Sequence, residues 1–414
     1  MPVLSFLRKK TAIPAGQAVV APQVPVGRLA LLYACLFFEL GVNLPFFPLW
    51  LKAQSLDSDA IGIVLAAPLL TRIIANPTVG ALADRSGRVA IVLTLCAVLV
   101  AAGTGLLTVA NGFWPILLVV IAIALAQGPL IALADAMTLE RLARTARPEL
   151  TYGRVRLWGA LGFAAANIIA GWALEWFSAA SIIVLLLTSA IATAVAAAGC
   201  MTGAASQAAG PVQGDSWPAH PLFLVCVIAG AALVQASHAA FYGFGALHWQ
   251  ANGISGAMMG GLWSLGVLSE VVLFACLGYR MSGAGSAAGL LLAAAAATIL
   301  RWAAMAQDPG LPALAGLQLT HGVTFGVTHL GSIFLLSRLA PGRMQASAQA
   351  WLAGGWAGLM AVLTTLSGWL YESWGEGIYL VMAMAAGAGL LLLLPVAYGL
   401  RRVMVDGLPE QQMR

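Results

Sequence analysis

Long apolar stretches separated by short polar segments run along almost the whole chain of 414 residues. A helix needs about 20 predominantly apolar residues to cross a bilayer, and twelve stretches of this kind can be laid down. The pattern predicts an all-α membrane protein with twelve transmembrane helices. These run over residues 27–51, 59–80, 88–111, 113–137, 150–174, 179–202, 221–248, 256–280, 286–306, 311–338, 344–370 and 376–400.

One longer connection, residues 203–219, is rich in alanine, glycine, serine and proline and is typical of a flexible linker. It divides the chain into an N-terminal six-helix bundle at 27–202 and a C-terminal one at 220–401, with tails at 1–26 and 402–414. The first tail lacks the pattern of a secretory signal.

Short similarities relate the two halves at offsets of 189 to 197 residues. An even number of helices per half gives both halves the same topology, related by an axis along the membrane normal, with a solute site expected between them. The similar segments are Ala83–Gly87 and Gly278–Gly283, Gly153-Arg154 and Gly342-Arg343, and Gly171–Glu175 and Gly368–Glu372.

Composition agrees with a lipid environment, because 61% of the residues are hydrophobic and 8% are charged, against about a quarter charged in soluble domains. With the N-terminus inside, 17 of the 20 lysines and arginines fall on the cytoplasmic side. The positive-inside rule therefore places both termini in the cytoplasm. We expect a multi-pass protein of the plasma membrane, most simply a bacterial inner membrane.

Several classes of function are disfavoured. The net charge of +5 is spread along the chain, so a nucleic-acid partner is not expected. The five cysteines lie in apolar runs without C-x-x-C spacing or clustered histidines, which predicts no disulfide framework, zinc site or cofactor. No phosphate loop, G-x-S-x-G or H-E-x-x-H motif occurs, so we expect no enzyme activity. The expected state is a monomer.

One motif joins the second and third predicted helices on the cytoplasmic side. It reads Gly80-Ala-Leu-Ala-Asp84-Arg85-Ser-Gly87-Arg88 and closely resembles a signature of the major facilitator superfamily. Gly80 allows close helix contact, Gly87 allows the turn, and the charges can form a conformational latch. The resemblance implies two pseudo-symmetric six-helix bundles and transport by alternating access.

Further segments resemble particular members of that superfamily. Tyr152-Gly-Arg154-Val-Arg156-Leu-Trp-Gly159 is similar to the start of helix 5 in lactose permease and in the phenylpropionate-permease-like group. The segments around His238 and Tyr242 and around His321 resemble the second group more specifically. The resemblance implies proton-coupled uptake of an aromatic acid, a nucleoside or a sugar.

Charged residues inside the predicted spans are the candidate functional groups. Each costs at least about 2.5–3.5 kcal/mol at the centre of a membrane helix, so its presence indicates a function. Glu39, Asp135, Glu270 and His321 are candidates for proton coupling. Arg72, Arg156, His238, Tyr242 and Arg301 are candidates for substrate binding.

The roles of individual charges follow partly from the resemblance. Asp135 and Arg156 can pair, and they match the sugar-binding acidic and basic residues of lactose permease, with Glu140 as the alternative acid. Glu270, Arg301 and His321 match its acidic, arginine and histidine positions. Thr324 stands where lactose permease has a carboxylate, so either Glu270 or Glu39 carries the proton or transport is not proton-driven.

The sequence thus predicts a secondary active transporter of a small organic solute, with proton symport as the leading mechanism. A proton-driven exporter of amphipathic compounds is the alternative within transport. A non-transporting sensor or a membrane enzyme is the alternative from another class, but the chain shows neither a soluble catalytic insertion nor a metal-ligand motif.

Overall fold

A computed structural model describes residues 25–143, 152–201, 220–277, 284–341 and 344–405. These residues are almost entirely helical and include no strand. The predicted linker, most of both tails, and the segments Gly278–Gly283 and Gly342-Arg343 lie outside the described residues. The all-helical class predicted from the apolar stretches is confirmed.

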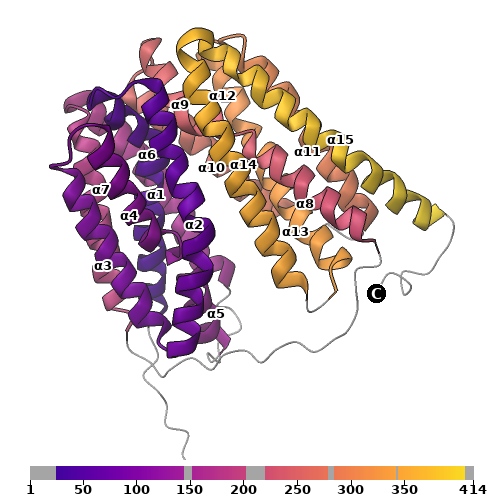
Figure 1. The fold of residues 1–414 in the computed structure, drawn as a ribbon, viewed down its shortest axis with the longest axis horizontal. Helices are drawn as coiled ribbons and strands as arrows, with labels where there is room; N and C mark the ends of the chain where they lie inside the picture. Colours follow the sequence, from indigo (N-terminus) through magenta and orange to yellow (C-terminus); the bar gives the residue numbers. More distant parts are fainter. Residues whose placement is uncertain (1–24, 144–151, 202–219, 278–283, 342–343, 406–414) are drawn as a thin grey trace, which may run out of the picture.

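Two groups of helices stand side by side (Figure 1). The first comprises α1 (Val26–Ala53), α2 (Ser58–Ser86), α3 (Val89–Leu107), α4 (Phe113–Gln127), α5 (Leu130–Ala143), α6 (Tyr152–Trp176) and α7 (Ala180–Ala198). The second comprises α8 (Pro221–Ala236), α9 (Ala239–Ala251), α10 (Gly256–Leu277), α11 (Ala284–Met305), α12 (Leu311–Leu319), the π-helix Gly322–Val327, α13 (Thr328–Leu339), α14 (Gln345–Trp374), a short 3-10 turn (Gly375–Gly377) and α15 (Ile378–Val405).

Eleven helical stretches among the described residues are long and apolar enough to cross a membrane. The last, Ser347–Leu400, is 54 residues long and covers most of both α14 and α15. Each of these two helices has enough residues to span by itself. If α14 and α15 are counted as two spans, the total is twelve, and this number stays a prediction.

Three of the predicted spans are interrupted. Gly128 and Pro129 separate α4 from α5, and proline has no backbone N–H for the helical ladder. Ser237 and His238 form a turn between α8 and α9. The third span passes through the π-helix, where the Gly322 amide donates a hydrogen bond to Ser269 Oγ at 2.9 Å. Such breaks free backbone and side-chain groups near the middle of membrane helices, where transporters place their sites.

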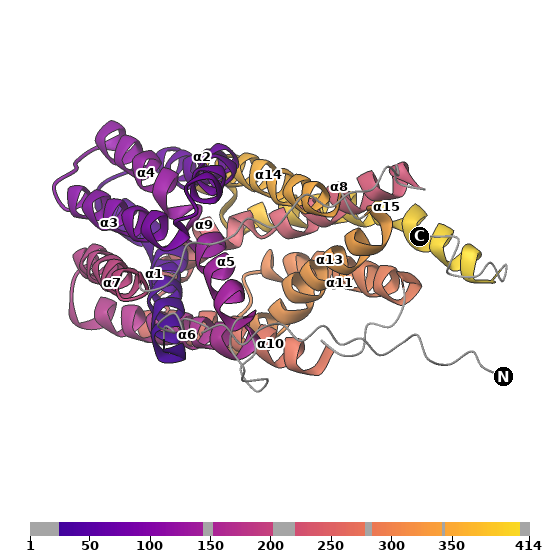
Figure 2. The same ribbon diagram turned by 90° about the horizontal axis from the view of Figure 1, so that it is seen from below.

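The two groups meet mainly through two helix pairs, α2 with α14 and α6 with α10, and α1 also contacts α9. Figure 2 shows these pairs on opposite sides of the molecule, with α1 and α9 between them. Contact is concentrated at one end, which we call the joined end and which carries the α1–α2 connection and the 3-10 turn Gly375–Gly377. Toward the other end, the divergent end, the groups separate, and Figure 1 shows α5 far from α13.

Glycines make the joined end possible. A Cβ on Gly368 of α14 would lie 2.6 Å from the Ser58 carbonyl oxygen and 3.1 Å from the Gly62 Cα of α2. A Cβ on Gly171 of α6 would clash with the Gly256 carbonyl oxygen of α10. Gly171 and Gly368 are the equivalent first residues of the repeated sequence segments, so each half contributes the same glycine to the contact.

Candidate functional site

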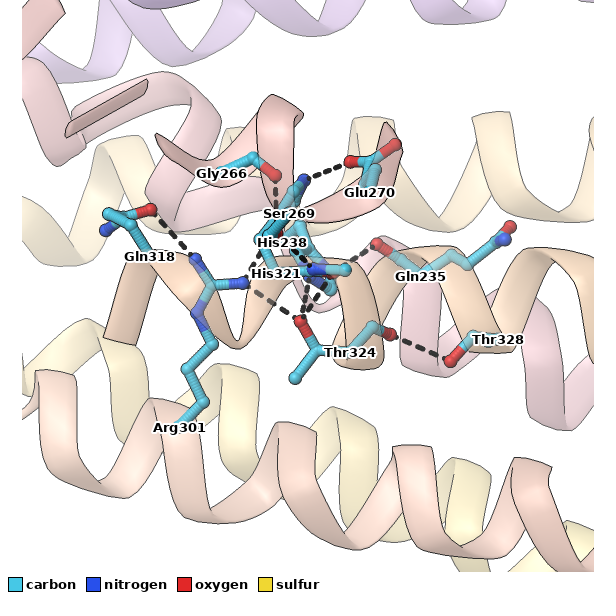
Figure 3. Close-up of polar contacts among 11 residues, drawn as sticks. Gln235, His238, Gly266, Ser269, Glu270, Arg301, Gln318, His321, Thr324 and Thr328 are labelled. Carbon is cyan, nitrogen blue, oxygen red and sulfur yellow. Dashed lines mark hydrogen bonds and ion pairs between the residues drawn. The ribbon is translucent and has the colours of Figure 1, made fainter. Parts of the chain in front are cut away.

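Arg301 lies at the centre of a polar cluster within the second helix group (Figure 3). It comes from α11, and its side chain is 1% exposed. The guanidinium Nη1 bonds His321 Nδ1 at 2.9 Å and Thr324 Oγ1 at 3.0 Å, and Nη2 bonds Gln318 Oε1 at 3.1 Å. Three of these groups come from the α12–π-helix–α13 segment, so the irregular helix is what aims them at the arginine.

Glu270 joins this cluster through a histidine. Its Oε1 lies 2.9 Å from His321 Nε2, while the other ring nitrogen of His321 contacts Arg301. The imidazole therefore stands directly between the carboxylate and the guanidinium. His238 approaches from the α8–α9 turn, with Nε2 3.4 Å from Thr324 Oγ1 and Nδ1 3.1 Å from the Gln235 carbonyl.

Aromatic rings surround the cluster. The Arg301 guanidinium lies 4.8 Å from the Trp302 ring centroid and 5.3 Å from that of Phe241. Phe241 stacks on Trp263 at 4.6 Å, and Tyr242 lies 5.8 Å from Trp263. A guanidinium against the faces of aromatic rings is stabilised electrostatically.

Four buried N–H groups around this region have no hydrogen-bond partner among the described residues. They are Arg301 Nε, Gln318 Nε2, Gln235 Nε2 and Trp263 Nε1. Buried donors normally find an acceptor. The surplus is entirely of donors, which is the chemistry that recognises an anionic or carbonyl-bearing solute.

A second polar cluster lies in the first helix group. Gln127, the last residue of α4, bridges two charges: Arg72 Nη2 donates to its Oε1 at 2.7 Å, and its Nε2 donates to Glu39 Oε1 at 2.7 Å. Glu39 is 4% exposed. The two charges therefore meet through an amide, next to the Gly128-Pro129 break.

The pair expected between Asp135 and Arg156 does not form in this structure. Asp135 Oδ1 accepts from the hydroxyls of Tyr33 at 2.5 Å and Tyr152 at 2.8 Å. The Arg156 guanidinium lies over the Phe37 ring at 3.8 Å and 5.6 Å from the Tyr33 ring centroid. Two tyrosines satisfy the carboxylate and a ring face holds the arginine, so the two charges share Tyr33 as a neighbour without contacting each other.

The six intramembrane charges named from the sequence avoid the outer surface of the bundles. Arg301 and Glu39 are buried, and the other four, Arg72, Asp135, Arg156 and Glu270, are partly buried. Any of them turned outward would face hydrocarbon, at the cost described above.

The latch motif lies at the divergent end. Gly87 ends α2 with φ of 60°, a left-handed conformation that glycine adopts without strain. Asp84, Arg85 and Arg88 are exposed, and none forms an ion pair with another residue that the structure describes. No atom lies within 4 Å of where a Gly80 Cβ would be. The close helix contact expected at Gly80 is therefore absent from this conformation.

Sequence reasoning did not select Gln127, Gln318 or Ser269 as site residues. Each is a polar side chain in an otherwise apolar span, and Gln127 directly precedes Gly-Pro. Uncharged polar side chains are common in membrane helices, so the sequence contained only a weak indication that these three have a function. What distinguishes these residues is contact with a buried charge or a broken helix, which only the fold reveals.

Comparison with known proteins identifies the family. Residues 26–381 match the model of the MFS_1 like family. The chain belongs to this family. The resemblance to the major facilitator superfamily drawn from the motifs is confirmed, and with it the expectation that the protein is not an enzyme, since its relatives are membrane transporters.

Two curated relatives cover most of this MFS_1 like chain. The "Probable 3-phenylpropionic acid transporter" of Escherichia coli (strain K12) is 33% identical over 374 residues, covering 86% of this chain and 94% of the relative. The "Maltose permease" of Geobacillus stearothermophilus is 29% identical over 380 residues, covering 89% and 93%.

Solved structures share the fold. The nucleoside transporter NupG superposes with a TM-score of 0.74 at 17% identity, covering 89% of this chain and 98% of NupG. The POT family transporter PepTSo superposes at 0.70 with 13% identity, covering 93% and 99%. The protein is a secondary transporter of a small solute in a membrane.

Proposed function

We propose that this protein is a proton-coupled symporter of a small aromatic carboxylate. The observation that carries the proposal is the buried Arg301, which faces aromatic rings on one side and reaches Glu270 through His321 on the other. A positive charge, unpartnered donors and ring faces together suit a molecule with one carboxylate and one aromatic ring. The relative named for 3-phenylpropionic acid supports this class over the nucleoside and sugar alternatives.

The solute carboxylate would bind the guanidinium of Arg301 and nearby donors such as Gln318 Nε2. Planar N–H groups in a fork match a carboxylate well, and charge-assisted hydrogen bonds are about twice as strong as neutral ones. The solute ring would lie among Phe241, Tyr242 and Trp263. His238 and, in the first helix group, Arg72 and Arg156 are proposed to complete the binding region.

Proton coupling would use the relay from Glu270 to His321 to Arg301. A carboxyl in apolar surroundings favours its protonated form, and a nearby arginine favours the ionised form. When the solute carboxylate binds Arg301, the positive charge of the arginine stabilises the ionised form of Glu270 less. Glu270 then takes up a proton. Solute and proton binding thus support each other. Glu39, with its Gln127–Arg72 bridge, and Asp135 are the further coupling candidates.

The charge distribution orients this mechanism. With Arg85, Arg88, the start of α1 and the end of α15 at the divergent end (Figure 1), the positive-inside rule makes that end cytoplasmic. The conformation described here would then be inward-facing, with the joined end outside. The latch of Asp84, Arg85 and Arg88 is proposed to assemble when the divergent end closes.

Uptake by proteoliposomes tests the proposal. Labelled 3-phenylpropionate, a nucleoside and maltose are offered with and without an inside-alkaline pH gradient. We expect the gradient to drive accumulation of the aromatic acid alone. Glu270→Gln should abolish gradient-driven accumulation but keep solute exchange, while Glu372→Gln, an exposed carboxylate at the joined end, should behave as wild type.

Two results would overturn parts of the proposal separately. Uptake of the aromatic acid that ignores the gradient removes proton coupling, and gradient-driven accumulation that survives in Glu270→Gln removes the role of Glu270 in it. Uptake of maltose or the nucleoside in place of the acid removes the substrate class. Extrusion of many unrelated amphipathic compounds would favour an exporter.

A further inference from the structure

Three side chains with metal-binding atoms meet at the joined end, away from the clusters described above. His248 lies near the end of α9, Asp308 in the connection between α11 and α12, and Glu376 in the 3-10 turn between α14 and α15. One ligand atom from each lies within 4.8 Å of the other two. All three belong to the second helix group, so contact between the groups is not needed to assemble them.

The three ligand atoms lie close enough together to converge on one cation. His248 Nε2 lies 3.0 Å from Asp308 Oδ1 and 3.1 Å from Glu376 Oε1. Zinc binds imidazole nitrogen and carboxylate oxygen at about 2.0–2.2 Å, so two ligands of one tetrahedral zinc lie roughly 3.3–3.5 Å apart. Small side-chain adjustments would therefore admit the metal, and the partly exposed site leaves its fourth position to water.

Asn252 holds one of the three ligands in place. Its Nδ2 lies 3.1 Å from Asp308 Oδ1 and 3.2 Å from Asp308 Oδ2, and 2.9 Å from His248 Nε2. An Nε2 that carries a hydrogen donates it to the carboxylates, whereas an Nε2 with a lone pair faces two carboxylate oxygens, acceptor against acceptor. A cation between these three acceptors would suit the lone-pair form of the imidazole.

A metal ion fits the form of the imidazole that carries the lone pair. It would bind the Nε2 lone pair and one oxygen from each carboxylate, and Asn252 would still donate to Asp308, as outer hydrogen bonds to metal ligands commonly do. The charges also favour a bound cation, because no lysine or arginine among the described residues forms a salt bridge with either carboxylate. Two carboxylates outweigh one imidazole in charge, even a protonated one, so a net negative charge is left for a cation to balance.

We propose that His248, Asp308 and Glu376 form a binding site for one divalent transition-metal ion of the zinc type. The site would fasten the end of α9 to two connections of the second helix group. It goes beyond the transport proposed above and does not depend on it. The spacing of metal-binding residues along the sequence does not reveal this site, because the three ligands lie far apart in the chain and come together only through the fold.

Zinc binding to the purified, tag-free protein tests the site. Titration against a fluorescent zinc chelator gives affinity and stoichiometry for wild type, His248→Ala, Asp308→Asn and Glu376→Gln. His220→Ala is the matched control, because His220 is an exposed histidine of the same helix group, before α8. Thermal unfolding with and without Zn²⁺ gives a second readout independent of transport.

We expect one Zn²⁺ per chain and a higher unfolding temperature with Zn²⁺. Each ligand variant should bind at least about tenfold more weakly and lose that thermal shift, while His220→Ala keeps both. If His248→Ala does not fold, the isosteric variants Asp308→Asn and Glu376→Gln still test the zinc site. No stoichiometric binding to wild type, unchanged affinity in both isosteric variants, or an equal loss in His220→Ala would overturn the site.

Discussion

Gly368→Ala should shift the transporter away from the conformation described here. The added Cβ would lie 2.6 Å from the Ser58 carbonyl oxygen and 3.1 Å from the Gly62 Cα, where ordinary contact begins at 3.4 Å. The deficit against Ser58 is 3.4 minus 2.6, or about 0.8 Å. Both obstructing atoms belong to the backbone of α2, so no side-chain rotation relieves the clash and the helices must separate.

The energetic effect follows from that geometry. Overpacking a well-packed contact costs about 1–3 kcal/mol, and here the cost falls only on the state in which α2 and α14 touch at the joined end. An energy of this size changes a two-state ratio by about 5- to 150-fold. The population should therefore move toward the state with a closed divergent end, and net uptake should slow.

Gly358→Ala is the matched control. Gly358 lies in the same helix, and no atom lies within 4 Å of where its Cβ would be. Both substitutions gain the same helix propensity, about 0.8–1.0 kcal/mol in a helix interior. A difference between the variants then reports the contact with α2 and not the backbone.

Spin labels measure the shift. They are placed at Ser86 and Ser347, exposed positions of α2 and α14 at the divergent end, after replacement of the five native cysteines. Gly368→Ala should lower the long-distance population that Gly358→Ala keeps. Identical distance distributions in the two variants, with equal thermal stability, would refute the reasoning about the joined end.

Three further predictions concern the polar clusters. Arg301→Lys keeps the charge but loses the planar array of N–H donors, so the apparent KM for the aromatic acid should rise about tenfold or more in uptake assays. An unchanged KM would show that the solute does not bind at Arg301. Gln127→Leu leaves a buried carboxylate and arginine without their bridging amide, which should cost about 1–3 kcal/mol and lower the unfolding temperature in detergent; an unaltered temperature contradicts the bridge. Exchanging Asp135 and Arg156 should rescue no more uptake than either single neutral substitution, because the carboxylate bonds Tyr33; clear rescue would show that the two charges pair during transport.

Much of the fold could be predicted from the chain alone. Membrane helices satisfy their own backbone hydrogen bonds, so the length of each apolar stretch gives the existence and type of each element. The segment Gly80–Arg88 also indicated the superfamily. The breaks in three spans were not predicted, because apolar periodicity does not report where a helix bends. Gly128-Pro129 was a readable signal, but the turn at His238 and the π-helix after His321 depend on neighbouring helices.

The candidate site divides in the same way. The cost of a charge in hydrocarbon selects Glu39, Glu270 and Arg301 from the sequence, since each such charge must turn away from lipid. The partner of each charge does not follow. Glu270 reaches Arg301 through His321, and Asp135 is held by tyrosines and not by an arginine.

The sequence by itself determined that the protein lies in a membrane, which family it resembles and which charged residues must be shielded from lipid, because these depend on composition and short motifs. Tertiary structure decided which of those residues meet, which end of the bundles is joined, and that His248, Asp308 and Glu376 converge. Contacts between residues far apart in the chain depend on how helices pack, and packing is set by the shapes of many side chains at once.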